Sequence, residues 1–343
     1  MTAFMKSILY KDGSAVLAET KVPEPGPGEV VIAVEACGLC GTDIMKLGTK
    51  PAAAVLGHEL CGRVAKAGRG AALKEGTRVV AAHHVPCGDC HYCRRGSESM
   101  CRQFKATNVA PGGFSEYVLL SALHVKHTTF IVPDGLDSAA ASQMEPLACC
   151  LRNAKRIGAR EGDVIGIVGM GAIGQLTARL LARAFGARVI GLDLDPNRAA
   201  ALKGYGNGVT DFAAFESAAR AESSGRGLDT LIMSVGTPAL AATAVPLVRD
   251  GGTLNVFASF HPDPVMPLDL NQVYHRELTI LSSYSPALGD LKESLDLIAS
   301  RRVDPVFADQ KAYGLDRFDD AVADVRARRA TKAILVPLER VAR

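Results

Sequence analysis

Hydrophobic and polar positions follow two different patterns along the chain. Up to about residue 130, short apolar or alternating runs, such as 30–34, 78–81 and 114–120, are separated by turns rich in glycine and proline. Runs of this length between turn residues are typical of β-strands. The first part of the chain is therefore expected to form a compact, barrel-like β domain.

The pattern changes at about Glu145, where a helical stretch through Ala159 is expected and apolar strands then alternate with helix-like runs. Strands are expected at 163–168, 188–192, 228–235, 253–258 and 278–283, and helices at 175–185 and 289–300. Such alternation predicts an α/β domain with a doubly wound parallel sheet, the Rossmann arrangement. A last strand at 333–338 is expected to return to the first domain. The predicted domains are therefore 1–150 with 286–343, and 151–285.

A glycine-rich turn joins the first predicted strand of the second domain to a helix. The G-x-G-x-x-G pattern spans Gly169, Gly171, Ala172, Ile173 and Gly174, and Asp193 ends the next strand about 20 residues further on. Glycines at these positions let a pyrophosphate approach the N–H groups at the start of the helix. Asp193 would accept hydrogen bonds from the adenosine ribose and repel a 2′-phosphate. The sequence therefore predicts a dinucleotide site that prefers NAD to NADP.

Composition limits the functions that the chain could have. With 343 residues, 48% hydrophobic and 22% charged, it resembles a soluble globular protein of one large or two ordinary domains. A net charge of +3 gives no reason to expect a nucleic acid or an anionic membrane as partner. No apolar run approaches the roughly 20 residues that cross a bilayer, and the start of the chain lacks a signal-peptide pattern. We expect a cytoplasmic protein whose nine cysteines are metal ligands or buried thiols rather than disulfides.

Four of these cysteines are spaced as metal ligands. Cys87, Cys90, Cys93 and Cys101 form C-x2-C-x2-C-x7-C, in which two-residue spacers allow neighbouring sulfurs to converge on one tetrahedral zinc. Because four thiolates leave no open position, this zinc would be structural. Unpaired surface thiols or disulfides are one alternative. A zinc ribbon for nucleic acid is another, but only Arg94, Arg95 and Arg102 gather nearby.

A second set of candidate ligands lies in three separate segments. His58 and Glu59 stand side by side between Gly57 and Gly62, Cys40 lies in the run C-G-L-C-G-T-D, and Glu145 precedes the nucleotide-binding pattern. A core histidine and a surface glutamate are the alternative interpretation of the H-E pair. Taken together, Cys40, His58, Glu59 and Glu145 predict a catalytic zinc, and a zinc with an open position can lower the pKa of a substrate hydroxyl.

These motifs resemble those of the zinc-containing medium-chain alcohol dehydrogenases. The run G-H-E-x-x-G-x-x-x-x-x-G from Gly57 to Gly68 and C-G-x-C-G-T-D at 37–43 are similar to that family's signatures. E-P-L at Glu145 is similar to the polyol and threonine dehydrogenase branch. The resemblance implies a GroES-like first domain with the four-cysteine lobe, Thr42 as first proton acceptor, Arg198 near the adenosine ribose, and a homodimer or homotetramer joined through the cofactor-domain sheets. Met45 stands where many relatives carry a proton-passing histidine.

The sequence therefore predicts an enzyme with two zinc ions per chain, one catalytic and one structural, and with NAD. Its expected substrate is a secondary alcohol, such as a polyol, a cyclitol, a sugar or an amino alcohol like threonine. A simple aliphatic or aromatic alcohol dehydrogenase and a non-catalytic zinc protein that senses NAD are the alternatives. With Cys40, Glu59 and Glu145 all bound, three negative ligands would surround a divalent ion. One glutamate is therefore expected to leave it during turnover, and the sequence does not say which.

Overall fold

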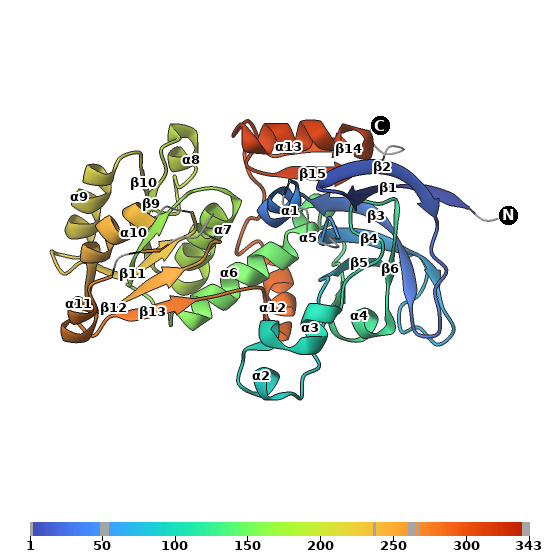
Figure 1. Ribbon diagram of the computed structural model, residues 1–343, viewed down its shortest axis with the longest axis horizontal. Coiled ribbons are helices and arrows are strands. Elements are labelled where there is room, and N and C mark those ends of the chain that lie inside the picture. Colours follow the sequence, from blue (N-terminus) through green and yellow to red (C-terminus); the bar gives the residue numbers. More distant parts are fainter. Residues whose placement is uncertain (1–2, 49–54, 236–237, 260–264, 267, 338–343) are drawn as a thin grey trace. The chain divides into compact units, whose positions relative to one another are not determined.

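The chain forms two compact units in the computed structural model, which describes residues 3–48, 55–235, 238–259, 265–266 and 268–337. Unit 1 holds the chain up to Glu145, Ala287–Arg301 and the segment from Pro305 onward. Unit 2 holds Pro146–Pro286 and Arg302–Asp304. In Figure 1, the blue start and the red end of the chain both belong to unit 1.

Unit 1 is built on a mixed sheet in the order β14-β15-β3-β4-β5-β7, with β6 pairing β3 and a separate β1–β2 hairpin. Its strands are β1 (Phe4–Lys11), β2 (Ser14–Lys21), β3 (Val30–Gly38), β4 (Glu59–Ala67), β5 (Arg78–Ala81), β6 (Tyr117–Leu120), β7 (Thr129–Ile131), β14 (Lys311–Gly314) and β15 (Ala333–Val336). Its helices are α1 (Gly41–Lys46), α2 (His91–Arg94), α3 (Arg102–Ala106), α4 (Ala122–His127), α5 (Ser138–Ser142), α12 (Leu288–Ala299) and α13 (Phe318–Arg326). Apolar side chains of β3, β4 and β6 fill the core of this unit.

The register of three neighbouring strands decides what meets at the end of β3. Gly38, the last residue of β3, lies opposite Glu59 at the start of β4 and opposite Ile334 near the start of β15. Residues from three distant parts of the sequence therefore meet at the same end of these three neighbouring strands.

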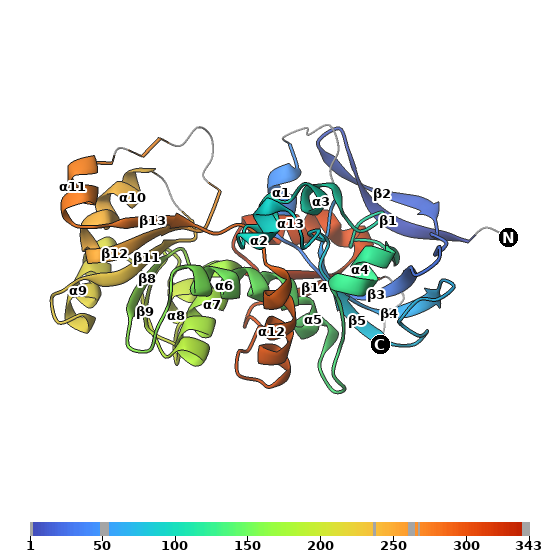
Figure 2. The same cartoon turned by 90° about the horizontal axis from the view of Figure 1, so that it is seen from below.

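Unit 2 is a six-stranded parallel sheet in the order β10-β9-β8-β11-β12-β13. Its strands are β8 (Val164–Val168), β9 (Arg188–Leu192), β10 (Asn207–Val209), β11 (Leu228–Met233), β12 (Val248–Val256) and β13 (Thr279–Ser282). Its helices are α6 (Met144–Arg156, which starts in unit 1), α7 (Ala172–Leu180), α8 (Pro196–Ala200), α9 (Phe212–Glu222), α10 (Pro238–Ala244) and α11 (Leu270–His275). In Figure 2, α10 and α11 lie on one side of these strands and α6, α7 and α8 on the other.

The strand order reverses at β8, which lies between β9 and β11. All five residues of β8 are buried, as is usual for a strand covered on both faces. In open parallel sheets, ligands bind beyond the carboxyl ends of the strands at such a reversal. The glycine-rich turn begins there, directly after Val168.

The predicted fold class, a β-rich domain and a doubly wound parallel sheet, is confirmed, whereas several predicted element boundaries are wrong. The predicted helix at 175–185 begins earlier, at Ala172, and its last five residues form a π-helical turn, Leu181–Phe185. The strand predicted at 114–120 is β6, which starts only at Tyr117; Ser115 instead makes an isolated bridge to Ser7. β12 starts at Val248 rather than at residue 253.

Two further expectations concern membrane-spanning helices and the pairing of two copies of the chain. No helix in the described part of the chain is both long and apolar enough to span a bilayer. β13 is the last strand on one side of the six-stranded sheet, and half of the Ile280 side chain is exposed there. The pairing of a second copy with this strand stays a prediction.

Candidate functional site

Three of the predicted zinc ligands meet in unit 1. One ligand atom from each of Cys40, His58 and Glu59 lies within 4.8 Å of the other two. Cys40 follows β3 and caps α1, while His58 and Glu59 stand at the start of β4. The pairing of β3 with β4 thus brings the thiol to the imidazole and the carboxylate.

Asp43 supports the imidazole of His58 on its Nδ1 side. This aspartate is fully buried, accepts hydrogen bonds from the N–H groups of Gly57 (3.1 Å) and Cys40 (3.3 Å), and places Oδ1 3.5 Å from Nδ1 of His58. Burial alone would raise its pKa, but His58, Lys46 and the Gly57 N–H together lower the pKa of Asp43 below its usual value. An anionic Asp43 at Nδ1 leaves Nε2 of His58 for a metal, the usual arrangement of a supported histidine ligand.

A buried lysine that the sequence analysis missed completes this cluster. The Nζ of Lys332 forms an ion pair with Oε2 of Glu59, and the side chains are only 3% and 1% exposed. Burial lowers the pKa of a lysine, but Glu59, Cys40 and Glu145 outweigh this effect and raise the pKa of Lys332 above its usual value. A β-carbon on Gly38 would overlap Glu59 Oε2 and come within 2.9 Å of Lys332 Cε, so the pair requires glycine at that position.

The remaining predicted site residues of unit 1 occupy different surroundings. Glu145 is buried in the first turn of α6, but it is not among the three residues whose ligand atoms meet within 4.8 Å. Thr42 is exposed in the first turn of α1, two residues after Cys40. Met45 is exposed on the same helix.

The four cysteines of the predicted lobe also converge, at 4.8 Å or less between their sulfurs. The Cys87 N–H donates to Sγ of Cys101 (3.4 Å), and the Cys90 N–H donates to Sγ of Cys87 (3.3 Å). Burial raises the pKa of Cys101, but backbone N–H groups, first that of Cys87, lower it to about 6. Burial and the thiol of Cys90, in contrast, raise the pKa of Cys93 to about 12. Four convergent cysteine sulfurs are the donor set that structural zinc prefers.

The predicted nucleotide site lies in unit 2, at the end of β8. The carboxylate of Asp193 accepts hydrogen bonds from the N–H groups of Met170 (2.8 Å) and Asp195 (3.0 Å), which fix it beside the glycine-rich turn. A β-carbon on Gly171 would meet only Nη1 of Arg198, at 3.9 Å. The space above this glycine is therefore open to a ligand and lies within reach of a guanidinium group.

A serine that the sequence analysis also missed supports this turn. The hydroxyl of Ser234, at the end of β11, lies 2.9 Å from the carbonyl oxygen of Val168 and 2.6 Å from that of Gly169. Ala172, Ile173 and Gly174 form the first turn of α7, whose N–H groups point toward the same space. The arrangement offers backbone donors for phosphate and a carboxylate for hydroxyl groups.

Comparison with known proteins shows where the chain belongs. The family model described as "Alcohol dehydrogenase GroES-like domain" matches residues 26–130, and the one described as "Zinc-binding dehydrogenase" matches residues 172–300. The sorbitol dehydrogenase of Bacillus subtilis (strain 168) is 30% identical over 93% of this chain and 92% of its own length. The chain belongs to the zinc-type medium-chain alcohol dehydrogenase family. The predicted recognition and the GroES-like nature of the first domain are thus confirmed.

Two further members of this zinc-type family illustrate its range. The L-threonine 3-dehydrogenase of Bacillus subtilis (strain 168) is 28% identical over 97% of this chain and 99% of its own length. A protein from Sinorhizobium meliloti 1021, described as a zinc-binding dehydrogenase and solved with NADP, matches with a TM-score of 0.86 and 27% identity, covering 98% of this chain and 100% of its own. Identity at this level establishes a zinc-dependent dehydrogenase that uses a nicotinamide cofactor, and it leaves the substrate open.

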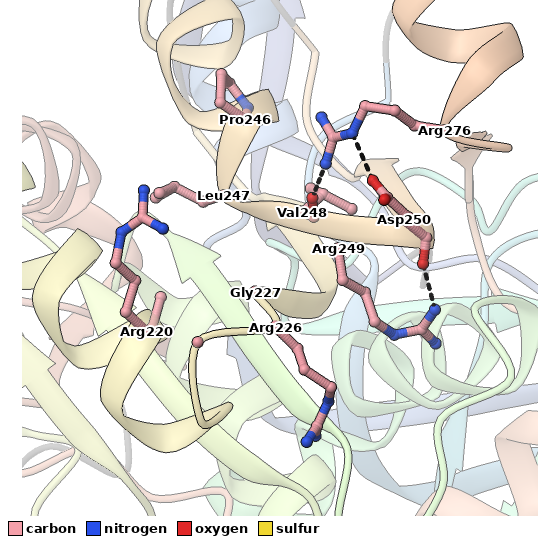
Figure 3. A pocket seen from close by; sticks show the side chains of 11 residues that line it. Arg220, Arg226, Gly227, Pro246, Leu247, Val248, Arg249, Asp250 and Arg276 are labelled. Atoms are coloured by element: carbon pink, nitrogen blue, oxygen red, sulfur yellow. Dashed lines mark hydrogen bonds and ion pairs between the residues drawn. The ribbon is translucent and has the colours of Figure 1, made fainter.

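Outside these sites, unit 2 of this dehydrogenase has a pocket of about 360 Å3 lined by Arg220, Arg226, Arg249 and Arg276 (Figure 3). It lies at the amino ends of β11 and β12, whereas the glycine-rich turn follows the carboxyl end of β8, so the pocket is not part of the nucleotide site. Three of the arginines form ion pairs: Arg220 with Glu216 (2.7 Å), Arg249 with Asp229 (2.6 Å) and Arg276 with Asp250 (2.8 Å). Most of its positive charge is thus already balanced.

Proposed function

We propose that this dehydrogenase transfers a hydride between NAD and a secondary alcohol that carries further hydroxyl or amino groups, such as a polyol, a cyclitol, a sugar or an amino alcohol like threonine. The convergence of Cys40, His58 and Glu59 carries the proposal, because a thiol, an imidazole and a carboxylate that meet at one point are a typical catalytic zinc site. The sorbitol and threonine dehydrogenases among its relatives support the substrate class.

Zinc held by Cys40 and His58 would supply a Lewis acid that lowers the pKa of the substrate hydroxyl. Asp43 orients His58 for this role, and the Thr42 hydroxyl, exposed beside Cys40, is the proposed first acceptor of the substrate proton. Met45 has no group that can carry a proton onward. Cys87, Cys90, Cys93 and Cys101 would hold the second, structural zinc.

Charge balance supports different roles for Glu59 and Glu145. A divalent ion and Lys332 supply three positive charges, which match the three negative charges of Cys40, Glu59 and Glu145 near Lys332. Lys332 gives Glu59 an alternative partner whenever the carboxylate is not on the metal. We therefore propose that Glu59 is the ligand that leaves when substrate or water enters, and that Glu145 neutralises charge or binds the metal from α6.

Lys332→Met should hold the catalytic metal more tightly than the wild type, because Glu59 loses its alternative partner and turns to the metal. We expect a chelator to remove this metal about tenfold more slowly, which corresponds to about 1.4 kcal/mol, and turnover to fall. Zinc release against a chelator, measured together with turnover, checks this. Lys332→Arg, which keeps the charge, is the control and should stay close to the wild type.

The double variant Glu59→Gln/Lys332→Met separates this effect from simple damage to the fold. With the carboxylate neutralised as well, the metal should leave at least as fast as from Glu59→Gln alone. Release from Lys332→Met at the wild-type rate or faster would contradict the role given to Glu59.

Asp193→Ser tests the cofactor choice. The wild type should use NAD with a kcat/KM at least tenfold above that for NADP, because the fixed carboxylate repels a 2′-phosphate. Serine removes this charge, and Arg198, whose guanidinium group reaches the turn, would then attract the phosphate. The NAD preference should shrink by about tenfold or more. Equal use of both cofactors by the wild type would show the assignment to be wrong.

A panel of polyols, cyclitols, sugars and amino alcohols, assayed for NAD reduction beside matched simple secondary alcohols, tests the proposed function. We expect at least one polyfunctional substrate to exceed its simple counterpart in kcat/KM by tenfold or more. Oxidation of simple alcohols alone would support an aliphatic or aromatic alcohol dehydrogenase instead. Binding of NAD without oxidation of any alcohol by the zinc-loaded protein would support a sensor.

A further inference from the structure

Four aromatic rings form a continuous stack of tilted contacts, with 42–43° between neighbouring ring planes, that runs from the candidate metal centre to the four-cysteine lobe. The ring of His83 lies 4.6 Å from that of His58, centroid to centroid, and His84 lies 3.9 Å from His83. Phe104 of α3 lies 4.6 Å from His84. All four residues belong to unit 1.

The backbone of the two central histidines is held in a bend. The chain bends at His83, which lets consecutive side chains stack on each other rather than point to opposite sides. Nε2 of the buried His124 lies 2.9 Å from the carbonyl oxygen of His83. The hydroxyl of Thr128 donates to the carbonyl of Ala82, at 3.1 Å. His124 of α4 and Thr128, which follows α4, thus hold the bend at His83 in place.

Packing, rather than hydrogen bonding at Nδ1, orients the ring of His83. Nδ1 is buried and has no hydrogen-bond partner among the described residues. A buried nitrogen of this kind is uncommon and calls for an explanation. His58 and His84 both contact this ring, so a shift of either neighbour can move it.

The far end of the stack is tied to the lobe. Thr107 directly follows α3. Its carbonyl oxygen lies 2.6 Å from Nδ1 of His84, and the Thr107 hydroxyl accepts a hydrogen bond from the Val85 N–H at 2.8 Å. Cys87 follows this segment by two residues, and Cys101 is the residue from which α3 starts. A metal bound to both cysteines would therefore fasten the histidine segment to α3.

We propose that His83, His84 and Phe104 are positioning residues that orient His58, and that the closed four-cysteine lobe keeps them stacked. The lobe then does more than stabilise the fold, because it determines how firmly the neighbouring centre holds its metal. This inference rests on the two proposed metal sites and is independent of the substrate and of the cofactor.

Phe104→Leu tests the stack because leucine fills much of the same space without a ring. With cobalt(II) in place of zinc, we expect a chelator to remove the metal of the Cys40 centre about tenfold faster than in the wild type. The absorption bands of this cobalt should also change. Cys40→Ser, which removes a ligand of this centre, identifies the phase of cobalt release and the absorption bands that belong to it. Phe104→Tyr, which retains a ring, should restore wild-type behaviour.

Phe212→Leu is the matched control, because Phe212 is a partly buried phenylalanine next to Phe215 in unit 2. It should lower thermal stability without changing the metal release or the cobalt bands. If Phe104→Leu lowered stability in the same way and also left both readouts unchanged, the stack would be ordinary packing and the proposal would fail. Should Phe104→Leu not fold, His84→Gln interrupts the same stack at one of its two partly exposed members.

A double-mutant cycle tests the link to the lobe. Cys93→Ser weakens the lobe metal and should speed loss of the metal at the Cys40 centre as Phe104→Leu does, while the combination should add little to either change. Fully additive effects, or no effect of Cys93→Ser, would overturn the proposed link. An inactive protein that still showed the coupling would contradict only the proposed enzyme function.

Discussion

The ion pair between Glu59 and Lys332 is the constraint on which the candidate metal centre depends. Two charges that are almost completely buried are tolerated only when each compensates the other. The register of β15, β3 and β4 brings the residues together, and Gly38 leaves the space that they need. In the absence of a bound metal, removing either partner would leave an unpaired buried charge near Cys40. The ends of the unit 1 sheet therefore set both the shape and the charge of the site.

The predicted nucleotide site holds the carboxylate of Asp193 by different means. Asp193 is fixed by backbone N–H groups of Met170 and Asp195 rather than by a buried cation, so lone pairs on both of its oxygens remain for a ligand. Glu59, in contrast, has a full positive charge as its partner. A carboxylate held by neutral donors is suited to recognise hydroxyl groups, whereas one paired with lysine can exchange between two cations.

Local spacing explains which parts could be predicted from the sequence. The residues of the G-x-G-x-x-G turn are close together in sequence, as are the four cysteines, and the H-E pair lies at the start of one strand. Lys332 could not be predicted, because a single lysine before an apolar strand gives no sign of a partner on β4. His83 and His84 resemble part of a polar loop in the sequence, and only the fold brings Phe104 against the ring of His84. The start of β12 was missed because Asp250, Gly251 and Gly252 are typical of a turn, whereas the strand absorbs them as a register shift against β11.

We propose that one chain contains two metal centres with different ligands. X-ray absorption at the zinc edge, combined with metal analysis of fully loaded protein, tests it most directly. We expect two zinc ions per chain, bound by five cysteine sulfurs in total, four in the lobe and one from Cys40, with nitrogen and oxygen completing the second centre. A single zinc surrounded by sulfur alone would contradict it, because the group formed by Cys40, His58 and Glu59 would then not be a metal site.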